Sequence, residues 1–135
     1  MDAIKYLYTY LLTVPVFFAI DMIWLGLIAK GLYAKELSKF LTDKPNWAAA
    51  AVFYLAYIAG IIVLAVMPAV EKQSLMKAVV LGGVFGGLAY ATYDLTNLAT
   101  LKDWPIKIVI IDIIWGMLLT AIVAGISYQI ANWVR

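Results

Sequence analysis

The chain has 135 residues, of which 66% are hydrophobic and 13% are charged, and its formal net charge is +2. Soluble domains carry roughly 45–50% apolar and about 25% charged residues, and a water-soluble fold of this length has too little interior to cover so much apolar surface. Lipid must therefore solvate much of the chain, and the near balance of basic and acidic residues gives no reason to expect a nucleic-acid partner.

The chain has no cysteine and no histidine. These absences exclude disulfides, thiol nucleophiles, iron–sulfur clusters and the usual zinc or haem ligation. They also remove the side chain that normally titrates near neutral pH. We therefore expect no cofactor and no metal site, because a divalent ion held by carboxylates alone has only weak support. Any proton transfer would have to use carboxyl groups, tyrosine or lysine.

Four long apolar segments are predicted to cross the membrane as helices, since a crossing needs about 20 mostly apolar residues. These segments are residues 6–29, 47–70, 76–101 and 106–133. The links between the last three are so short that those helices must run antiparallel. We predict a single all-α membrane domain over residues 1–135, an antiparallel bundle of four transmembrane helices surrounded by membrane lipid.

The polar stretch at residues 30–46, between the first two spans, has apolar residues at helical spacing with charged residues elsewhere on the wheel. This pattern is typical of a short amphipathic helix, at about residues 31–42, lying on the membrane surface. A plain solvated loop fits the same residues equally well.

The first half of the third span contains GGVFGG, which forms two overlapping G-x-x-x-G pairs, Gly82 with Gly86 and Gly83 with Gly87. Such pairs let helix backbones approach closely. Packing within the bundle is the simpler interpretation, and a homodimer seam is the alternative.

Three aspartates, Asp21, Asp94 and Asp112, interrupt the apolar segments. A charged side chain at membrane depth costs about 2.5–3.5 kcal/mol on insertion scales, so such residues are functional candidates. Because successive helices alternate in direction and rise 1.5 Å per residue, all three fall roughly 7–12 Å below the same surface. This common depth predicts that they line one acidic cavity and bind a ligand or a proton.

Each aspartate also has a purely structural interpretation. Asp94 could cap a short helix if the third span ended early. Asp112 lies near a helix start, where the helix dipole favours an acid. Asp21 is far from any predicted helix end, and it could instead form a hydrogen bond between helices.

Aromatic, hydroxyl and amide side chains share the predicted aspartate layer and extend the candidate site. They are Trp24, Trp115, Tyr90, Tyr93, Thr92, Thr96 and Asn97. The pattern D-x-I-W occurs twice, from Asp21 and from Asp112, and its spacing places each Asp and Trp on neighbouring positions of one helix face. Chance is a competing explanation for so short a repeat, and the aromatic residues also fit an interfacial belt.

The segments IDMIWLGLIAKGLY and AYATYDLTNLATLKDWP, with the DIIWG block, resemble a bacterial family of small four-helix membrane proteins known as domain of unknown function 2177. The resemblance covers nearly the whole chain. It implies the helix count and a location in the inner membrane, and it implies no activity.

Three classes of function fit these observations. The favoured one is binding or transport of a small cationic or amphiphilic solute, because carboxylates and aromatic faces attract cations. The second is an intramembrane enzyme that acts on a lipid or isoprenoid by carboxylate acid–base chemistry. The third is an accessory or structural subunit. A site open to lipid would favour the enzyme, an opening to water would favour transport, and a packed interior would favour the accessory role.

Overall fold

The structure is a computed structural model that describes residues 3–134, and within that range it contains helices and no strand. Four helical segments are long and apolar enough to cross a membrane, which confirms the predicted four-helix membrane fold. They are Ala3–Ile28, Trp47–Glu71, Leu75–Thr100 and Ile106–Trp133.

The first two membrane segments are each composed of more than one helical element. The first consists of α1 (Ala3–Ile23) and a π-helical turn, η1 (Trp24–Ile28), and is followed by α2 (Lys30–Glu36). The second consists of α3 (Trp47–Ile61), a further π-helical stretch, η2 (Ile62–Val66), and α4 (Met67–Glu71). The third and fourth are single helices, α5 (Leu75–Thr100) and α6 (Ile106–Trp133).

Side-chain caps mark where two of the spans begin. The Asn46 side chain accepts a hydrogen bond from the Ala49 amide at 3.0 Å, and Ser74 accepts one from Lys77 at 3.0 Å. Each satisfies an amide that has no partner inside its helix. Pro105, which has no amide hydrogen to leave unpaired, is the residue from which α6 starts.

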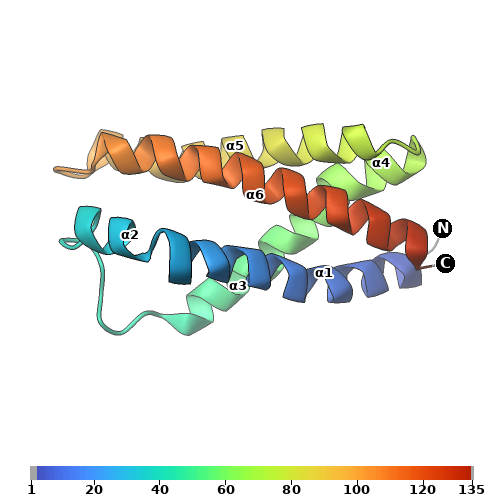
Figure 1. Cartoon of the computed structure of the whole chain (residues 1–135), viewed down its shortest axis with the longest axis horizontal. Helices are drawn as coiled ribbons and strands as arrows, with labels where there is room; N and C mark the ends of the chain where they lie inside the picture. Colours follow the sequence, from blue (N-terminus) through green and yellow to red (C-terminus); the bar gives the residue numbers. More distant parts are fainter. Residues whose placement is uncertain (1–2, 135) are drawn as a thin grey trace.

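The helices alternate in direction, so that both termini lie at the same end of the bundle as the link from α4 to α5 (Figure 1). The opposite end carries residues 30–46 and the link from α5 to α6. Helices α5 and α6 lie side by side along most of their length, and α1 packs against α6. The second span crosses the others obliquely: η2 packs against α5 and α6, whereas α3 makes little contact with α5.

Glycine sets the close approach of α5 and α6. A Cβ added at Gly82 would lie 2.7 Å from the Thr120 carbonyl oxygen, and one at Gly86 would lie 2.5 Å from the Thr120 hydroxyl and collide with the Gly116 carbonyl. A Cβ at Gly116 would collide with the Tyr90 ring. The faces of Gly82 and Gly86 are therefore filled by α6 of the same chain. Gly83 and Gly87 lie beside this seam and have more room: a Cβ would meet Ala121 at 3.8 Å and Met117 at 3.0 Å.

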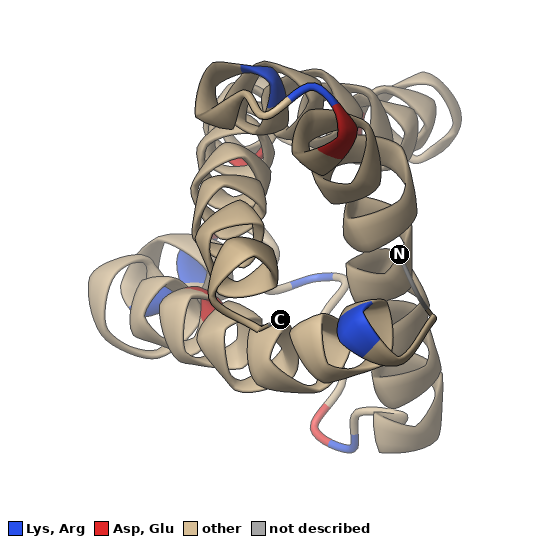
Figure 2. Cartoon of the chain, turned by 90° about the vertical axis from the view of Figure 1, so that its right-hand side faces the viewer, with Lys and Arg blue, Asp and Glu red and all other residues tan. Residues whose placement is uncertain are grey.

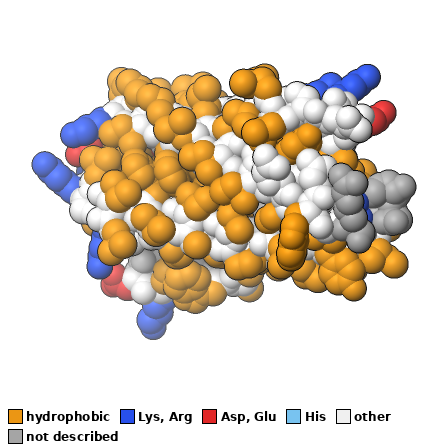
Figure 3. Space-filling model, turned by 45° about the vertical axis from the view of Figure 1, so that its right-hand side comes forward, with side chains coloured by type: hydrophobic (Ala, Val, Ile, Leu, Met, Phe, Trp, Pro, Cys, Tyr) orange, Lys and Arg blue, Asp and Glu red, His pale blue; other side chains and the backbone are white. Residues whose placement is uncertain are grey.

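The main core lies in the half of the bundle nearer the termini. It contains fully buried residues from all four spans, including Phe17, Ile61, Ala78 and Val123. Apart from three aspartates within the spans, the charged residues lie near the ends of the bundle and in the links (Figure 2). Apolar side chains cover much of the bundle between its charged ends (Figure 3). Large apolar residues such as Leu27, 79% exposed, lie on this outer surface, as expected of a chain that crosses a membrane.

The helix after the first span is shorter than the predicted residues 31–42, because α2 ends at Glu36 and residues 37–40 form a turn. Its apolar residues Leu32 and Tyr33 are partly buried and pack on protein. They contact a small core that is composed of Leu37, Trp104, Ile108 and Val109. The turn that follows the helix lies against the link from α5 to α6, where Lys39 pairs with Asp103 at 3.0 Å.

Candidate functional site

The three aspartates of the membrane spans belong to one polar cluster near the end that carries α2. Asp94 is fully buried, Asp21 is 3% exposed, and Asp112 is partly buried. They come from three different helices, α5, α1 and α6. The surrounding side chains determine which of them can meet a ligand.

The two D-x-I-W sequences are linked to each other crosswise. Trp115 of the second donates its indole N–H to Asp21 of the first at 3.2 Å. Trp24 of the first donates to the Tyr33 hydroxyl at 3.3 Å, and Tyr33 in turn donates to Asp112 of the second at 2.7 Å. The two indole rings stack with centroids 4.5 Å apart and planes 10° apart. Trp115 therefore holds the Asp21 carboxyl group directly, and Trp24 acts on Asp112 through Tyr33.

A wide helical turn begins at Trp24. The Ala29 amide donates to the Trp24 carbonyl at 2.7 Å, a bond between residues five apart instead of the usual four. Such turns are rare and are frequently found at functional sites. Here the turn joins α1 to α2 and leads the chain directly to Tyr33.

Asp94 lies beside Asp112, as the packing of α5 on α6 requires. Gly86 meets Thr120 and Tyr90 meets Gly116, so the next step of four residues brings Asp94 to Asp112. The two carboxyl groups lie close enough to interact with each other. Neither oxygen of Asp94 accepts a hydrogen bond from any donor in the described part of the chain.

A pocket of about 380 Å³ adjoins this cluster between α3, α5 and α6. Two of its lining residues are largely exposed to the outside of the bundle, Phe53 at 51% and Tyr93 at 54%. The pocket therefore opens sideways, on the face where α3 diverges from α5. Its lining residues are Phe53, Tyr54, Ala89, Tyr90, Tyr93 and Asp112.

Asp112 and Tyr93 are the candidates in the predicted binding set that line the pocket, together with Tyr90 from the same predicted layer. Asp21 and Asp94 belong to the cluster but do not reach the pocket surface. Thr96 is exposed, and its hydroxyl bonds back to carbonyl groups of its own helix, those of Thr92 and Tyr93. Asn97 is partly buried and lies beside the Tyr93 hydroxyl.

Two tyrosines central to the site were missed from the sequence. Tyr33 lies within the residues predicted as a surface helix, and its spacing of four from Leu37 puts both on the face that packs inward. Tyr54 lies in a span without any charge, where aromatic residues at positions 53, 54 and 57 were the only signal. Burial and the hydrogen bond to Asp112 raise the pKa of Tyr33 above its usual value, so its hydroxyl stays a donor.

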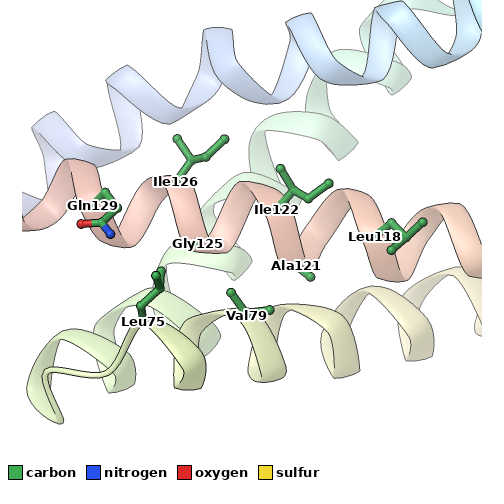
Figure 4. Close-up of a pocket in the computed structure, with 8 residues that line it drawn as sticks. All are labelled: Leu75, Val79, Leu118, Ala121, Ile122, Gly125, Ile126 and Gln129. Atoms are coloured by element: carbon green, nitrogen blue, oxygen red, sulfur yellow. The ribbon is translucent and has the colours of Figure 1, made fainter.

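A second hollow, of about 430 Å³, lies between α5 and α6 in the half of the bundle nearer the termini (Figure 4). Its lining is apolar apart from one amide, so it offers no acid, base or counter-charge. The lining residues are Leu75, Val79, Leu118, Ala121, Ile122, Gly125, Ile126 and Gln129. Within residues 3–134, no group of three or more Asp, Glu, Cys or His side chains is placed to hold a metal ion.

Comparison with known proteins supports the membrane assignment and gives the family. Residues 6–129 match the model of a family described as "Predicted membrane protein (DUF2177)". No curated protein and no solved structure matches the chain. The match covers nearly all of the chain and includes every residue of the pocket and of the aspartate cluster, so this protein belongs to the DUF2177 family of membrane proteins.

Proposed function

We propose that this protein, in the inner membrane of a bacterium, binds and transports a small cationic amphiphile that enters the pocket from the bilayer. The observation that carries the proposal is the pocket itself. Four aromatic side chains and one carboxyl group line it, and it opens to the side of the bundle. Rings with a carboxylate recognise quaternary ammonium groups through cation–π and charge interactions.

Asp112 is the counter-charge in this proposal. Its Oδ1 accepts the Tyr33 hydroxyl at 2.7 Å, which fixes the direction of the carboxyl group. The side chains of Tyr54, Tyr90 and Tyr93 line the same space. A cation bound there would be attracted by the carboxylate and by the rings in a setting with little water, where both attractions are strong.

The sideways opening favours an amphiphile over a fully hydrophilic ion. Phe53 and Tyr93 flank the opening, and both are about half exposed on the lipid-facing surface. A cationic head group could reach Asp112 between them while its apolar tail remained in the lipid. A fully hydrated ion would have to cross apolar lipid to reach the same entrance.

The test uses hexyltrimethylammonium as the probe, titrated calorimetrically into protein in lipid nanodiscs, with empty nanodiscs as the blank. Hexyldimethylamine N-oxide has the same tail without net charge and should bind much more weakly. Asp112→Asn should lower the affinity for the ammonium probe by about tenfold or more, equivalent to about 1.4 kcal/mol. Asp103→Asn, which changes the exposed acid paired with Lys39, is the matched control and should leave the affinity unchanged.

Equal affinity of the wild-type protein and Asp112→Asn for the ammonium probe would refute the proposal. So would equal binding of the charged and uncharged compounds, since the pocket would then recognise the tail alone. Transport is tested separately, by uptake of the probe into proteoliposomes, which Asp112→Asn should abolish.

One observation favours a second candidate function, acid–base catalysis on a lipid. Asp94 and Asp112 form a pair of carboxyl groups beside a pocket open to lipid, and such a pair can serve as acid and base. This function predicts a change in the mass spectrum of nanodisc lipids during incubation with the wild-type protein. The change should be absent with Asp112→Asn.

A further inference from the structure

We infer that Asp94 holds a proton and donates it to Asp112, so that the pair carries one negative charge and the pocket selects a ligand with a single positive charge. The protonation of Asp94 stands on the structure of the cluster alone. The selection of a singly charged ligand rests on the function proposed above.

The first argument is that Asp94 has no source of hydrogen bonds if it is ionised. Its exposure is 0%, and neither oxygen has a donor among residues 3–134. In the same described range, no Lys or Arg lies within 4.0 Å of Asp94 or Asp112, and the ion pair found is the exposed one between Lys39 and Asp103. A buried carboxylate without a donor or a counter-ion is strongly destabilised, because its charge loses the solvation that water provides.

The second argument is the chemistry of the neighbouring group. Asp112 is also an acceptor when ionised, so two carboxylates in contact repel and cannot bond to each other. One proton between them converts this contact into a strong hydrogen bond from an acid to a carboxylate. The titratable groups near the pair are Tyr33 of α2, Tyr54 of α3, Tyr90 and Tyr93 of α5, and Asp21 of α1, and none of them supplies a positive charge.

The position of the proton follows from the different surroundings of the two groups. Asp112 already accepts the Tyr33 hydroxyl and is partly open to the pocket, so it can remain ionised. Asp94 is fully buried and does not line the pocket, and the carboxyl group beside it is that of Asp112. Asp94 is therefore the acid and Asp112 the carboxylate, which receives one hydrogen bond from each side.

This arrangement makes Asp94 a positioning residue and sets the charge of the site. The pair presents one negative charge to the pocket, which one ammonium group neutralises. A second positive charge on the ligand would have no partner in the pocket lining. The site should therefore bind hexyltrimethylammonium more tightly than hexamethonium, which has the same six-carbon chain with an ammonium group at both ends.

The test compares Asp94→Asn with Asp112→Asn. The asparagine amide can donate to Asp112 as the protonated acid does, so Asp94→Asn should fold with nearly the wild-type melting temperature and bind hexyltrimethylammonium within about twofold of wild type. Asp112→Asn should lose that binding. In infrared difference spectra near neutral pH, the wild-type protein should show the C=O band of a protonated carboxylic acid, shifted in D₂O, that Asp94→Asn lacks.

The outcomes separate this inference from the proposed function. If no protonated-acid band distinguishes wild type from Asp94→Asn, or if Asp94→Asn fails to fold, Asp94 is not a neutral donor and the inference is wrong whether or not the probe binds. If the band is present and no probe binds, the proton is confirmed and the proposed function fails. Equal binding of hexamethonium and hexyltrimethylammonium would overturn the charge selection.

Discussion

The close contact of α5 with α6 gives the sharpest prediction about stability, the effect of Gly86→Ala. An added Cβ at this position meets the Gly116 carbonyl and the Thr120 side chain, whose Cβ would be 2.7 Å away. The obstacle includes backbone, so no rotation of a side chain can relieve it. The two helices must move apart along the seam.

The size of the effect follows from two opposing terms. Overpacking a tight site costs typically 1–3 kcal/mol, and a collision with backbone places this site at about the upper end. Replacing a helical glycine by alanine returns roughly 0.5–1 kcal/mol through backbone entropy. We therefore expect Gly86→Ala to lower the free energy of unfolding by about 2 kcal/mol.

Gly83→Ala is the matched control, because it lies on the same helix and its Cβ would meet Ala121 at an ordinary 3.8 Å. Only the entropy term applies there, so this variant should be stabilised by roughly 0.5–1 kcal/mol. The assay is reversible unfolding in mixed micelles by a denaturing detergent, followed by circular dichroism. If the two variants have the same stability, α5 and α6 do not approach at Gly86 as the structure has them.

Two further predictions concern the linked tryptophans and Tyr33. Trp115→Phe removes the hydrogen-bond donor to Asp21, which is 3% exposed, and should lower the free energy of unfolding by about 1–3 kcal/mol. Trp24→Phe should lower it less, because Tyr33 still donates to Asp112. Equal losses of stability in thermal melts of the two variants would contradict these hydrogen-bond assignments. The pKa of Tyr33 in the folded state is raised above its usual 10.0, so above pH 10.0 the folded state keeps a proton that the unfolded state loses. The stability that Tyr33 contributes is therefore fully present below pH 10.0 and falls as the pH rises above 10.0. Unfolding measured against pH should show a smaller alkaline loss in Tyr33→Phe, and parallel curves for the two proteins would refute this reasoning.

The membrane fold could be predicted because the bilayer imposes it. A span must be about 20 apolar residues long, and the links show directly where one ends and the next begins. Asp21, Asp94 and Asp112 could be assigned a common depth by the same logic, since depth depends only on rise per residue and on helix direction.

The arrangement within that layer could not be predicted, because it depends on how each helix is rotated about its axis and on side chains from other elements. Depth alone does not show that Asp112 faces a pocket while Asp94 is sealed behind it. Tyr33 enters from a helix outside the membrane spans, and Tyr54 comes from a span with no polar interruption. The spacing of Tyr33 and the aromatic neighbours of Tyr54 do not show that either residue belongs to the aspartate site.

The pocket exists because the second span packs against α5 and α6 at one end and diverges from α5 at the other, where it contacts α1. Its attachment lies near Tyr57, which bonds to Thr120 at 2.7 Å and stacks on Phe85 with ring centroids 4.9 Å apart. Gly60 continues this contact, since an added Cβ there would lie 3.1 Å from the Phe85 ring.

Before this point in the chain, α3 diverges from α5 and leaves the space that Phe53 and Tyr54 line. The seam of α5 and α6 sets the opposite wall, where Thr120 faces Gly86 and, two helical steps farther along, Asp112 faces Asp94. Thr120 thus takes part in two contacts. It bonds to Tyr57 of the oblique span, and it packs on Gly86 in the seam of α5 and α6 that continues to the acidic pair. Separating α5 from α6 at Gly86 should for that reason weaken ligand binding as well as the fold.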